Sequence, residues 1–323
     1  MVRYFLKFSY IGTQYRGLQR QSGNSFIRDT DSIQGALETA LLTIAPKSLI
    51  RPSLCLSSRT DIGVHALCNT GHVELENKYG QIYNTSDIKK YVNRYFIKCG
   101  HSIRLLDCIP VTYDFHVRAS VKSRTYIYRF MIPKVPEEHR ISLAEAAHTY
   151  HLRTYNFDID RARSGTKLFM GTKDFTTFSA KTETKHKIQY VRSLNSFTLE
   201  EAQPLMSFDP LSENFRYWHF MCNGRAFLYN QVRRMVGALF ALGLGKITEK
   251  DITVMLQVPS HHNWNTRITP APSNGLHLLN VEYDLDELKR CTILEEQEKK
   301  LQSEEQEQEL QLEEQKQKLQ LNE

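Results

Sequence analysis

The 323-residue chain lacks zinc-type cysteine motifs, apolar runs of membrane-spanning length and a secretory signal peptide. Its six cysteines form no C-x-x-C pair and show no Cys/His spacing of the zinc type, so we expect reduced thiols in an intracellular protein and no structural zinc. Apolar stretches such as 235–244 are too short for the roughly 20 residues of a membrane-spanning helix. Residues 1–10 lack the basic start and apolar run of a secretory signal peptide, which argues against secretion.

The net charge of +6 conceals two regions of opposite sign. Residues 291–323 are almost entirely Glu, Gln, Lys and Leu, with ten Glu against four Lys, so this tail carries −6 and the rest of the chain +12. A body this basic is typical of nucleic-acid-binding proteins, although charge alone also fits a protein that is merely basic. The tail leucines keep a heptad spacing in only two pairs, so we expect disorder or a solvent-exposed helix, not a coiled coil.

Hydrophobic periodicity predicts the main elements of the body. Apolar residues alternate over 2–10, which indicates a strand. Ser32 is a suitable N-cap for an amphipathic helix that ends before Pro46, and a second such helix follows Ser86. A long apolar stripe over 228–242 predicts a third helix, and Thr248 with Asp251 forms the capping box of a fourth. Further strands are predicted at 54–58, 71–76, 123–132 and 215–222.

Each half of the body contains strands interrupted by a few helices, without strict alternation of strand and helix. This pattern favours an α+β fold with a largely antiparallel sheet. We expect an N-terminal half over 1–132 that carries Asp61, a Pro-containing connection over 133–165, a C-terminal half over 166–290 and the acidic tail over 291–323.

The densest polar cluster lies over 57–66, between two apolar strand candidates. Loops at strand ends are common places for functional sites. The spacing alone fits a tight turn better, in which Asp61 bonds nearby backbone amides and Gly63 supplies a positive φ. A metal site of Asp61, His65 and His72 is a weaker alternative, because it lacks a helical H-x-x-x-H and a carboxylate cluster.

Two other clusters combine arginines with aromatic residues. Over 115–118 and 123–129, cations that can contact phosphates alternate with rings that can stack on unpaired bases. Tyr126 and Tyr128 fit half-buried sheet positions equally well. Over 224–237, Arg233 and Arg234 flank an apolar helix, which usually means a solvated edge unless a carboxylate lies opposite.

In their order, these segments resemble the TruA-type tRNA pseudouridine synthase family. The run R-T-D-x-G-V-H-A over 59–66 is similar to the family's signature, in which the Asp is catalytic. Nearly the whole body takes part in the resemblance, and the eukaryotic branch called tRNA pseudouridine synthase-like is the most similar. Leu18 departs from the pattern, since much of the family has Trp there. The other matching segments lie at 10–19, 32–38, 115–118, 126–128, 174–178, 227–237 and 270–276.

The resemblance implies two ferredoxin-like halves that form one continuous, mainly antiparallel sheet, with helices on one face and a basic central cleft. It implies the isomerisation of uridine to pseudouridine in RNA, with tRNA as the first expected substrate and mRNA as a second. The reaction is redox-neutral and releases nothing, so we expect no cofactor and no metal. This agrees with the absence of G-x-G-x-x-G and G-x-x-x-x-G-K-[ST] motifs. A noncatalytic RNA-binding protein on this fold and a metal-dependent nuclease are the competing hypotheses.

By resemblance, Asp61 is the nucleophile or ion-pair partner that acts on a flipped-out base. Arg233 keeps this carboxylate ionised, and we expect its planar guanidinium to bind Asp61 through two parallel hydrogen bonds where Gly237 lets the Asp61 loop approach. Tyr126 packs against the target base and serves in the final proton abstraction. The expected substrate-binding residues are Arg59, His65, Arg118 and Tyr128.

Partner and location follow from the same resemblance. RNA is the expected partner, no membrane association is expected, and a homodimer is left open. The branch suggests mitochondria, although the opening motif begins by Tyr10 and leaves little room for a transit peptide. Cytoplasm and nucleus are the alternatives.

Overall fold

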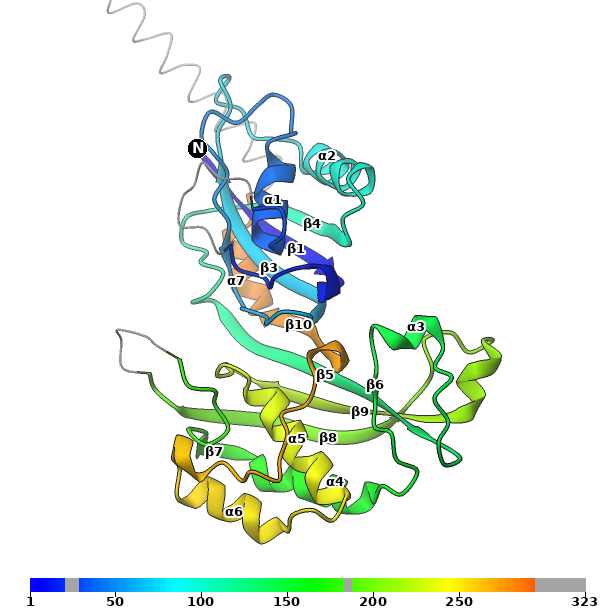
Figure 1. The fold of residues 1–323 in the computed structure, drawn as a ribbon. Helices are drawn as coiled ribbons and strands as arrows, with labels where there is room; N and C mark the ends of the chain where they lie inside the picture. The colour runs from blue at the N-terminus through cyan, green and yellow to red at the C-terminus, as the bar shows by residue number, and fades with distance from the viewer. Residues whose placement is uncertain (21–28, 183–187, 294–323) are drawn as a thin grey trace, which may run out of the picture.

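The computed structural model describes residues 1–20, 29–182 and 188–293. They form a mixed α/β fold with one large open sheet and seven α-helices (Figure 1). The strand order is β4-β1-β3-β10-β5-β9-β8-β7, with β2 paired to β3 and β6 paired to β5. Among the described residues only the β10–β3 and β5–β6 pairs are parallel, so the expected antiparallel character is confirmed. None of the described helices has the length and apolarity needed to cross a membrane.

The chain first builds one end of the sheet. Strand β1 (Val2–Tyr10) confirms the alternation seen in the sequence, since Tyr4, Leu6 and Phe8 are fully buried on one face. It lies between β3 and β4 and pairs antiparallel with both. The other elements of this end are α1 (Ile33–Leu41), β2 (Cys55–Leu56), β3 (His65–Leu75), α2 (Thr85–Lys98) and β4 (Ile103–Val111).

Side-chain caps explain where α1 and α2 begin. The Ser32 hydroxyl accepts from the Gly35 backbone N–H, which confirms the predicted N-cap. For α2 the cap is Asn84, whose side chain accepts from Ser86 and Asp87, so this helix begins slightly before the predicted start. These caps satisfy amide groups that the first helical turn leaves unpaired.

The second part of the chain extends the sheet from β5 (Val121–Pro133). The predicted capping box of Thr248 and Asp251 is present at the start of α6. The segment 133–165, which we expected to be a connection, contains a short helix, a short strand and most of α4. The elements after β5 are α3 (Leu143–Ala146), β6 (Tyr150–His151), α4 (Ile159–Thr166), β7 (Gly171–Asp174), β8 (Val191–Ala202), β9 (Phe215–Gly224), α5 (Gln231–Gly243), α6 (Glu249–Gln257), β10 (Leu276–Tyr283) and α7 (Leu285–Cys291).

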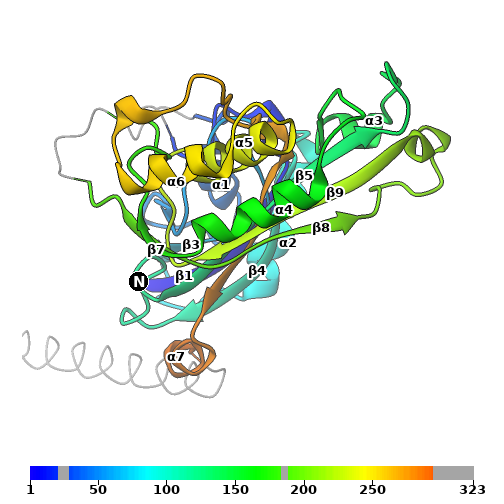
Figure 2. The same cartoon turned by 90° about the horizontal axis from the view of Figure 1, so that it is seen from below.

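The expectation that all helices lie on one face of the sheet is wrong for α7. The main core joins α1, α2, α4, α5 and α6 to one face, including Leu6 and Phe8 of β1. On β1, Phe5 points to the opposite face and packs in a separate cluster with Cys291, against which Leu288 also packs. Figure 2 shows α7 on the other side of the sheet from α1, α4 and α5. The apolar positions of α7 therefore cover the second face of β1.

Three residues of the expected acidic tail belong to the folded body. Cys291 is buried at the end of α7, Thr292 forms a β-bridge with Val111, and the Ile293 backbone N–H donates to Pro110. The expectation of disorder or an exposed helix falls on residues 294–323, which lie outside the described residues.

Candidate active site

A cavity of about 750 Å³ lies between the loop that follows β2 and the beginning of α5. The floor includes Tyr126 of β5, and one wall carries Asp61. Among the lining residues that the structure describes, Asp61 is the single acidic residue and five are arginines. These are Arg16, Arg59, Arg118, Arg124 and Arg233.

Asp61 sits in a tight turn that neighbouring groups hold in place. Gly63 adopts a φ of 78°, and the Val64 backbone N–H donates to the Asp61 carbonyl over 3.2 Å. The preceding residue, Thr60, bonds the Tyr10 hydroxyl at 2.7 Å through its side chain and accepts from the Leu18 amide through its carbonyl. The positive φ at Gly63 confirms the turn, while the Asp61 carboxylate faces Arg233.

Arg233 contacts Asp61 through one edge of its guanidinium group. Its Nη1 lies 3.7 Å from Asp61 Oδ2, and both side chains are mostly buried, at 21% and 26% exposed. The expected pair of parallel hydrogen bonds is absent, because Nε donates to Ala271 O at 2.7 Å and Nη1 donates to Asn230 Oδ1 at 2.9 Å. Arg233 is thus fixed by neighbours on its own side of the cavity.

The local backbone around α5 explains this position of Arg233. Asn230 adopts a left-handed conformation with a φ of 60°, and the buried Gln231 side chain accepts from the Leu228 amide, which together form the turn into the helix. A Cβ on Gly237 would lie 2.3 Å from Thr269 O. The segment that approaches Gly237 is therefore 269–271, which corrects the expectation that the Asp61 loop would do so.

Burial raises the pKa of Asp61 above its usual value, although the positive charge and hydrogen bonding of Arg233 oppose this rise. Burial also raises the pKa of Tyr126 to about 12, with a smaller upward contribution from the negative charge of Asp61. Near neutral pH, Tyr126 therefore keeps its phenolic proton, and Arg233 is the group that favours the ionised form of Asp61.

The structure brings five of the seven expected site residues to the cavity. Tyr126 is 7% exposed and packs edge-on against Phe227, with ring centroids 5.1 Å apart. Arg59 and Arg118 are exposed on the cavity lining, and Arg118 Nε donates to Leu56 O at 2.8 Å. Asp61 and Arg233 complete this set.

His65 and Tyr128 do not reach the cavity. Tyr128 is buried in the core, where its hydroxyl donates to Pro272 O and its ring packs against Phe240. His65 is 1% exposed, and its Nδ1 accepts from the Gly12 amide at 3.1 Å. We therefore remove both from the substrate-binding set, because neither side chain has a face open to the cavity.

Arg124 was expected only as one of the basic residues over 123–129 and was not named as a site residue. It lines the cavity from β5, two residues before Tyr126 and therefore on the same face of that strand. The signal was present in the alternation of 123–132, since any face that carries Tyr126 toward the site also carries residue 124.

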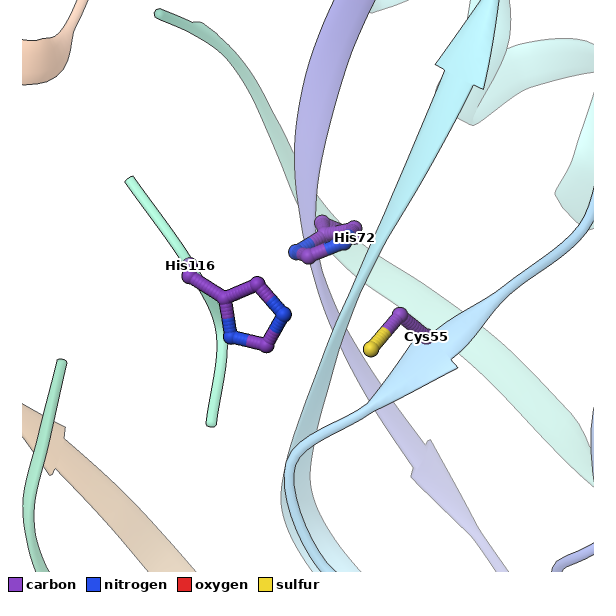
Figure 3. A group of neighbouring side chains, drawn as sticks. All are labelled: Cys55, His72 and His116. Carbon is purple, nitrogen blue, oxygen red and sulfur yellow. The ribbon is translucent and has the colours of Figure 1, made fainter. Parts of the chain in front are cut away.

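Within residues 1–20, 29–182 and 188–293, two groups of side chains could in principle hold a metal ion, and neither includes Asp61. The ligand atoms of Cys55, His72 and His116 lie within 4.8 Å of one another, and Figure 3 shows their side chains converging. However, His72 Nδ1 accepts from the Val117 amide and His116 Nδ1 accepts from the Arg118 amide. Each ring therefore carries its proton on Nε2, whereas a metal-binding histidine donates from the nitrogen that does not bind the metal. This donor set does not fit a metal ion.

The second group consists of His65, His148 and His277, which stack at the junction of β3 and β10. Burial lowers the pKa of His65 to about 4 and that of His277 to about 3, so both rings are neutral near pH 7. Because His65 Nδ1 accepts from the Gly12 amide, its proton lies on Nε2, the only other ring nitrogen that could bind an ion. The group therefore fits a packed cluster of neutral rings better than a metal site.

Comparison with known proteins identifies the family. Residues 166–284 match the family model described as tRNA pseudouridine synthase. The chain is 31% identical to tRNA pseudouridine synthase-like 1 of Xenopus laevis over 301 residues, which cover 92% of this chain and 96% of that protein. It is 29% identical to the human protein of the same name, over 90% of this chain and 93% of that one. It is also 29% identical to tRNA pseudouridine synthase A of Dinoroseobacter shibae, over 90% and 99%. The chain therefore belongs to the tRNA pseudouridine synthase family.

Proposed function

We propose that this protein converts uridine to pseudouridine in tRNA, with Asp61 as the nucleophile. The observation that carries the proposal is the contact between Asp61 and Arg233 inside a cavity lined by arginines. The order of the family motifs along the chain and the similarity to named synthases support the same activity.

The cavity has the size and charge for a flipped nucleotide. Its volume of about 750 Å³ lies within the range of sites that enclose small organic ligands. In the described part of its lining, five arginines stand against one aspartate, which favours a polyanion because arginine cations can replace the counterions of phosphate groups. A basic central cleft is thus part of the proposal, with tRNA as the substrate and mRNA as an alternative for the same chemistry.

The order of the strands supports two ferredoxin-like halves. In the first half, the chain follows a β-α-β-β-α-β path and its strands lie side by side in the order β4-β1-β3-β2. In the second half, the strands lie in the order β10-β5-β9-β8. If the strands of each half are numbered 1 to 4 along the chain, both halves have the spatial order 4-1-3-2. We therefore propose that the halves divide between β4 and β5. The boundary expected at residue 132 assigned β5 to the first half, and the late strand β10 returns to join the two.

The proposed reaction breaks the N1–C1′ bond of uridine, turns the uracil and forms a C5–C1′ bond. The hydrogen on C5 is lost and N1 gains a proton, so the net change is an isomerisation without a co-reactant. The ionised Asp61 attacks the flipped nucleotide, at the base or at the sugar, and Arg233 supports its negative charge. Tyr126 keeps its phenolic proton near neutral pH, so we assign it two roles, packing against the uracil and donating a hydrogen bond. It can accept the C5 proton only if its phenolic proton is transferred away in the same step.

The variant Asp61→Asn tests the proposed chemistry. The amide keeps the size of the side chain but cannot attack, so turnover should vanish while RNA affinity stays within about tenfold of wild type. Turnover is measured as tritium released from C5-labelled uridine in tRNA. Asp107→Asn is the matched control. Asp107 lies on β4, pairs with Lys7 of β1 and Lys89 of α2, and does not line the cavity. Turnover retained by Asp61→Asn contradicts the mechanism.

The alternative is a noncatalytic RNA-binding protein on the same fold. Tight tRNA binding by the wild type without tritium release would favour it over the synthase. A homodimer and a mitochondrial location are further proposals from the family resemblance, to be tested by light scattering and by cell fractionation.

A further inference from the structure

Arg124 occupies an unusual position on the sheet. It lies on β5, a central strand, where its backbone is paired with Gly224 of β9 on one side and Val281 of β10 on the other. Its side chain is partly buried and faces the cavity. The backbone of Arg124 is therefore fixed by strand pairing on both sides.

The guanidinium group of Arg124 makes three hydrogen bonds to two separate segments. Nε donates to Ser58 Oγ and Nη2 donates to Ser57 O, each at 2.7 Å. Nη1 donates to the carbonyl of Arg225. Ser57 and Ser58 belong to the loop that reaches Asp61 three residues later, and Arg225 begins the segment that leads into α5 and Arg233. One side chain thus bonds both walls of the cavity.

No carboxylate pairs with Arg124 within residues 1–20, 29–182 and 188–293. Burial lowers the pKa of Arg124, which means that its charge is held in this place at a cost in free energy. Its three acceptors are uncharged oxygens, so the geometry of the planar group, with donors at fixed angles, is what this position uses.

The Asp61–Arg233 contact is sensitive to the separation of the two walls. It is a single approach at 3.7 Å, and Arg233 is anchored to Ala271 and Asn230 on its own side. Neither of these anchors restrains the Asp61 loop. Thr60 holds that loop to Tyr10 and Leu18, which belong to the β1 side of the site.

We propose that Arg124 is a positioning residue, which holds the Asp61 loop and the α5 wall at the separation that the Asp61–Arg233 contact requires. This inference rests on the proposed function of the cavity. Arg124 acts through Ser57, Ser58 and the Arg225 carbonyl, and its role needs the shape of the guanidinium group as well as its charge.

The test is Arg124→Lys in the full chain. Lysine keeps the positive charge, but its single ammonium group cannot reach three acceptors on two segments. We expect kcat to fall by about tenfold to 10²-fold, because a misplacement of about 1 Å is enough for such a loss. The KM for tRNA should stay within about threefold, and the salt dependence of binding should be unchanged, because no phosphate contact is lost.

A second readout does not depend on turnover. The titration of Asp61 can be followed by NMR of ¹³C-labelled aspartate carboxyl groups, with the Asp61 signal assigned through its loss in Asp61→Asn. Arg233 from α5 is the charged group that lowers the pKa of Asp61, and the negative charge of Asp61 in turn raises the pKa of Tyr126 on β5. Because Arg233 lowers the pKa of Asp61, a wider separation in Arg124→Lys should raise the titration midpoint of Asp61.

Two further variants control the test. Arg216→Lys is the matched control on the neighbouring strand β9, and it should match wild type. Arg216 is exposed, and its hydrogen bond to a described residue goes to the Tyr155 carbonyl. Ser58→Ala removes one of the three bonds without changing Arg124, and should shift kcat and the Asp61 midpoint in the same direction by less. This variant carries the test if Arg124→Lys does not fold.

An unchanged kcat and an unchanged Asp61 midpoint in Arg124→Lys would overturn the inference. A raised KM with unchanged kcat would also overturn it, and would identify Arg124 as a phosphate contact. If the wild type shows no turnover on any tRNA, the proposed function fails. In that case, the Asp61 titration still decides whether Arg124 positions the loop.

Discussion

At the scale of single residues, the sequence predicts that two side chains lie close together more reliably than it predicts the hydrogen bonds between them. The motif order predicts that Asp61 and Arg233 lie together, and they do. It does not predict that Ala271 and Asn230 occupy the hydrogen bonds expected between Arg233 and Asp61, because those acceptors come from backbone and loop conformations that no motif encodes. Nor does any motif predict the place of Tyr128, which was expected to bind substrate beside Tyr126. Its hydroxyl donates a hydrogen bond to the Pro272 carbonyl in the core.

Substitution of Arg233 tests this contact at the residue scale. Lysine in Arg233→Lys keeps the charge but cannot bond Ala271 and Asn230 while it faces Asp61. Turnover should therefore fall by about 10²-fold, with RNA binding largely retained. Single-turnover kinetics and filter binding measure the two effects separately.

Arg234→Lys is the neighbouring comparison. Arg234 stacks over Trp264, with its guanidinium carbon 4.5 Å from the ring centroid, and donates to Thr177 O. Its loss should lower the free energy of unfolding by about 1 kcal/mol and leave turnover nearly unchanged. Equal losses of turnover in the two variants would mean that Arg233 acts only as part of a basic surface.

At the scale of elements, the success of the sequence analysis depends on uninterrupted alternation. Strands β5 and β9 pair in an unbroken register, and both were predicted. Strands β4, β8 and β10 were not predicted. In β8 the apolar residues Leu194 and Phe197 lie three positions apart, and the pairing with β9 shifts register between Leu194 and Ser196. A β-bulge adds one residue and so interrupts the two-residue period on which strand prediction depends. The pairings of β1 with β3 and β4 also shift register, but only near the end of β1, so most of its alternation is intact and the strand was predicted.

The turn after Asp61 gives a prediction at this scale. Gly63 and Gly171 have nearly the same φ, 78° and 80°, so alanine should cost about 1 kcal/mol of stability at either position. A Cβ on Gly63 would lie 2.6 Å from Ser273 Oγ, whereas a Cβ on Gly171 would meet nothing within 4 Å. Gly63→Ala should therefore also reduce turnover by about tenfold, because it displaces the loop that carries Asp61.

Thermal unfolding and initial rates of the two variants check this prediction. Gly171→Ala controls for the conformational cost of a positive φ. Equal turnover in the two variants would show that the Gly63 turn does not set the position of Asp61.

At the scale of the whole molecule, the distribution of charge is the main feature that the sequence predicts. Residues 294–323 hold all ten Glu and four Lys of the acidic tail, and the rest of the chain carries +12. The expected start of the tail at Cys291 could not be corrected from composition, because the packing of that thiol against Phe5 is a tertiary contact.

Truncation after Ile293 tests the role of this charge. Removing 294–323 takes away a charge of −6, so tRNA affinity should rise at low salt and turnover should stay the same or improve slightly. Affinity of both forms should fall steeply with salt between about 50 and 200 mM, because several phosphate contacts release counterions. Electrophoretic mobility shifts over a salt series measure both effects. Loss of turnover on truncation, or a flat salt dependence, would contradict the account of the charged cleft.

The central claim is that the cavity around Asp61 makes pseudouridine in tRNA, and site-by-site mapping of pseudouridine in cells tests it most directly. Cells that lack the protein are compared with cells complemented by wild type or by Asp61→Asn. We predict that specific tRNA sites lose pseudouridine without the protein, regain it with wild type and do not regain it with Asp61→Asn. An unchanged map in cells that lack the protein, or full restoration by Asp61→Asn, would contradict the claim.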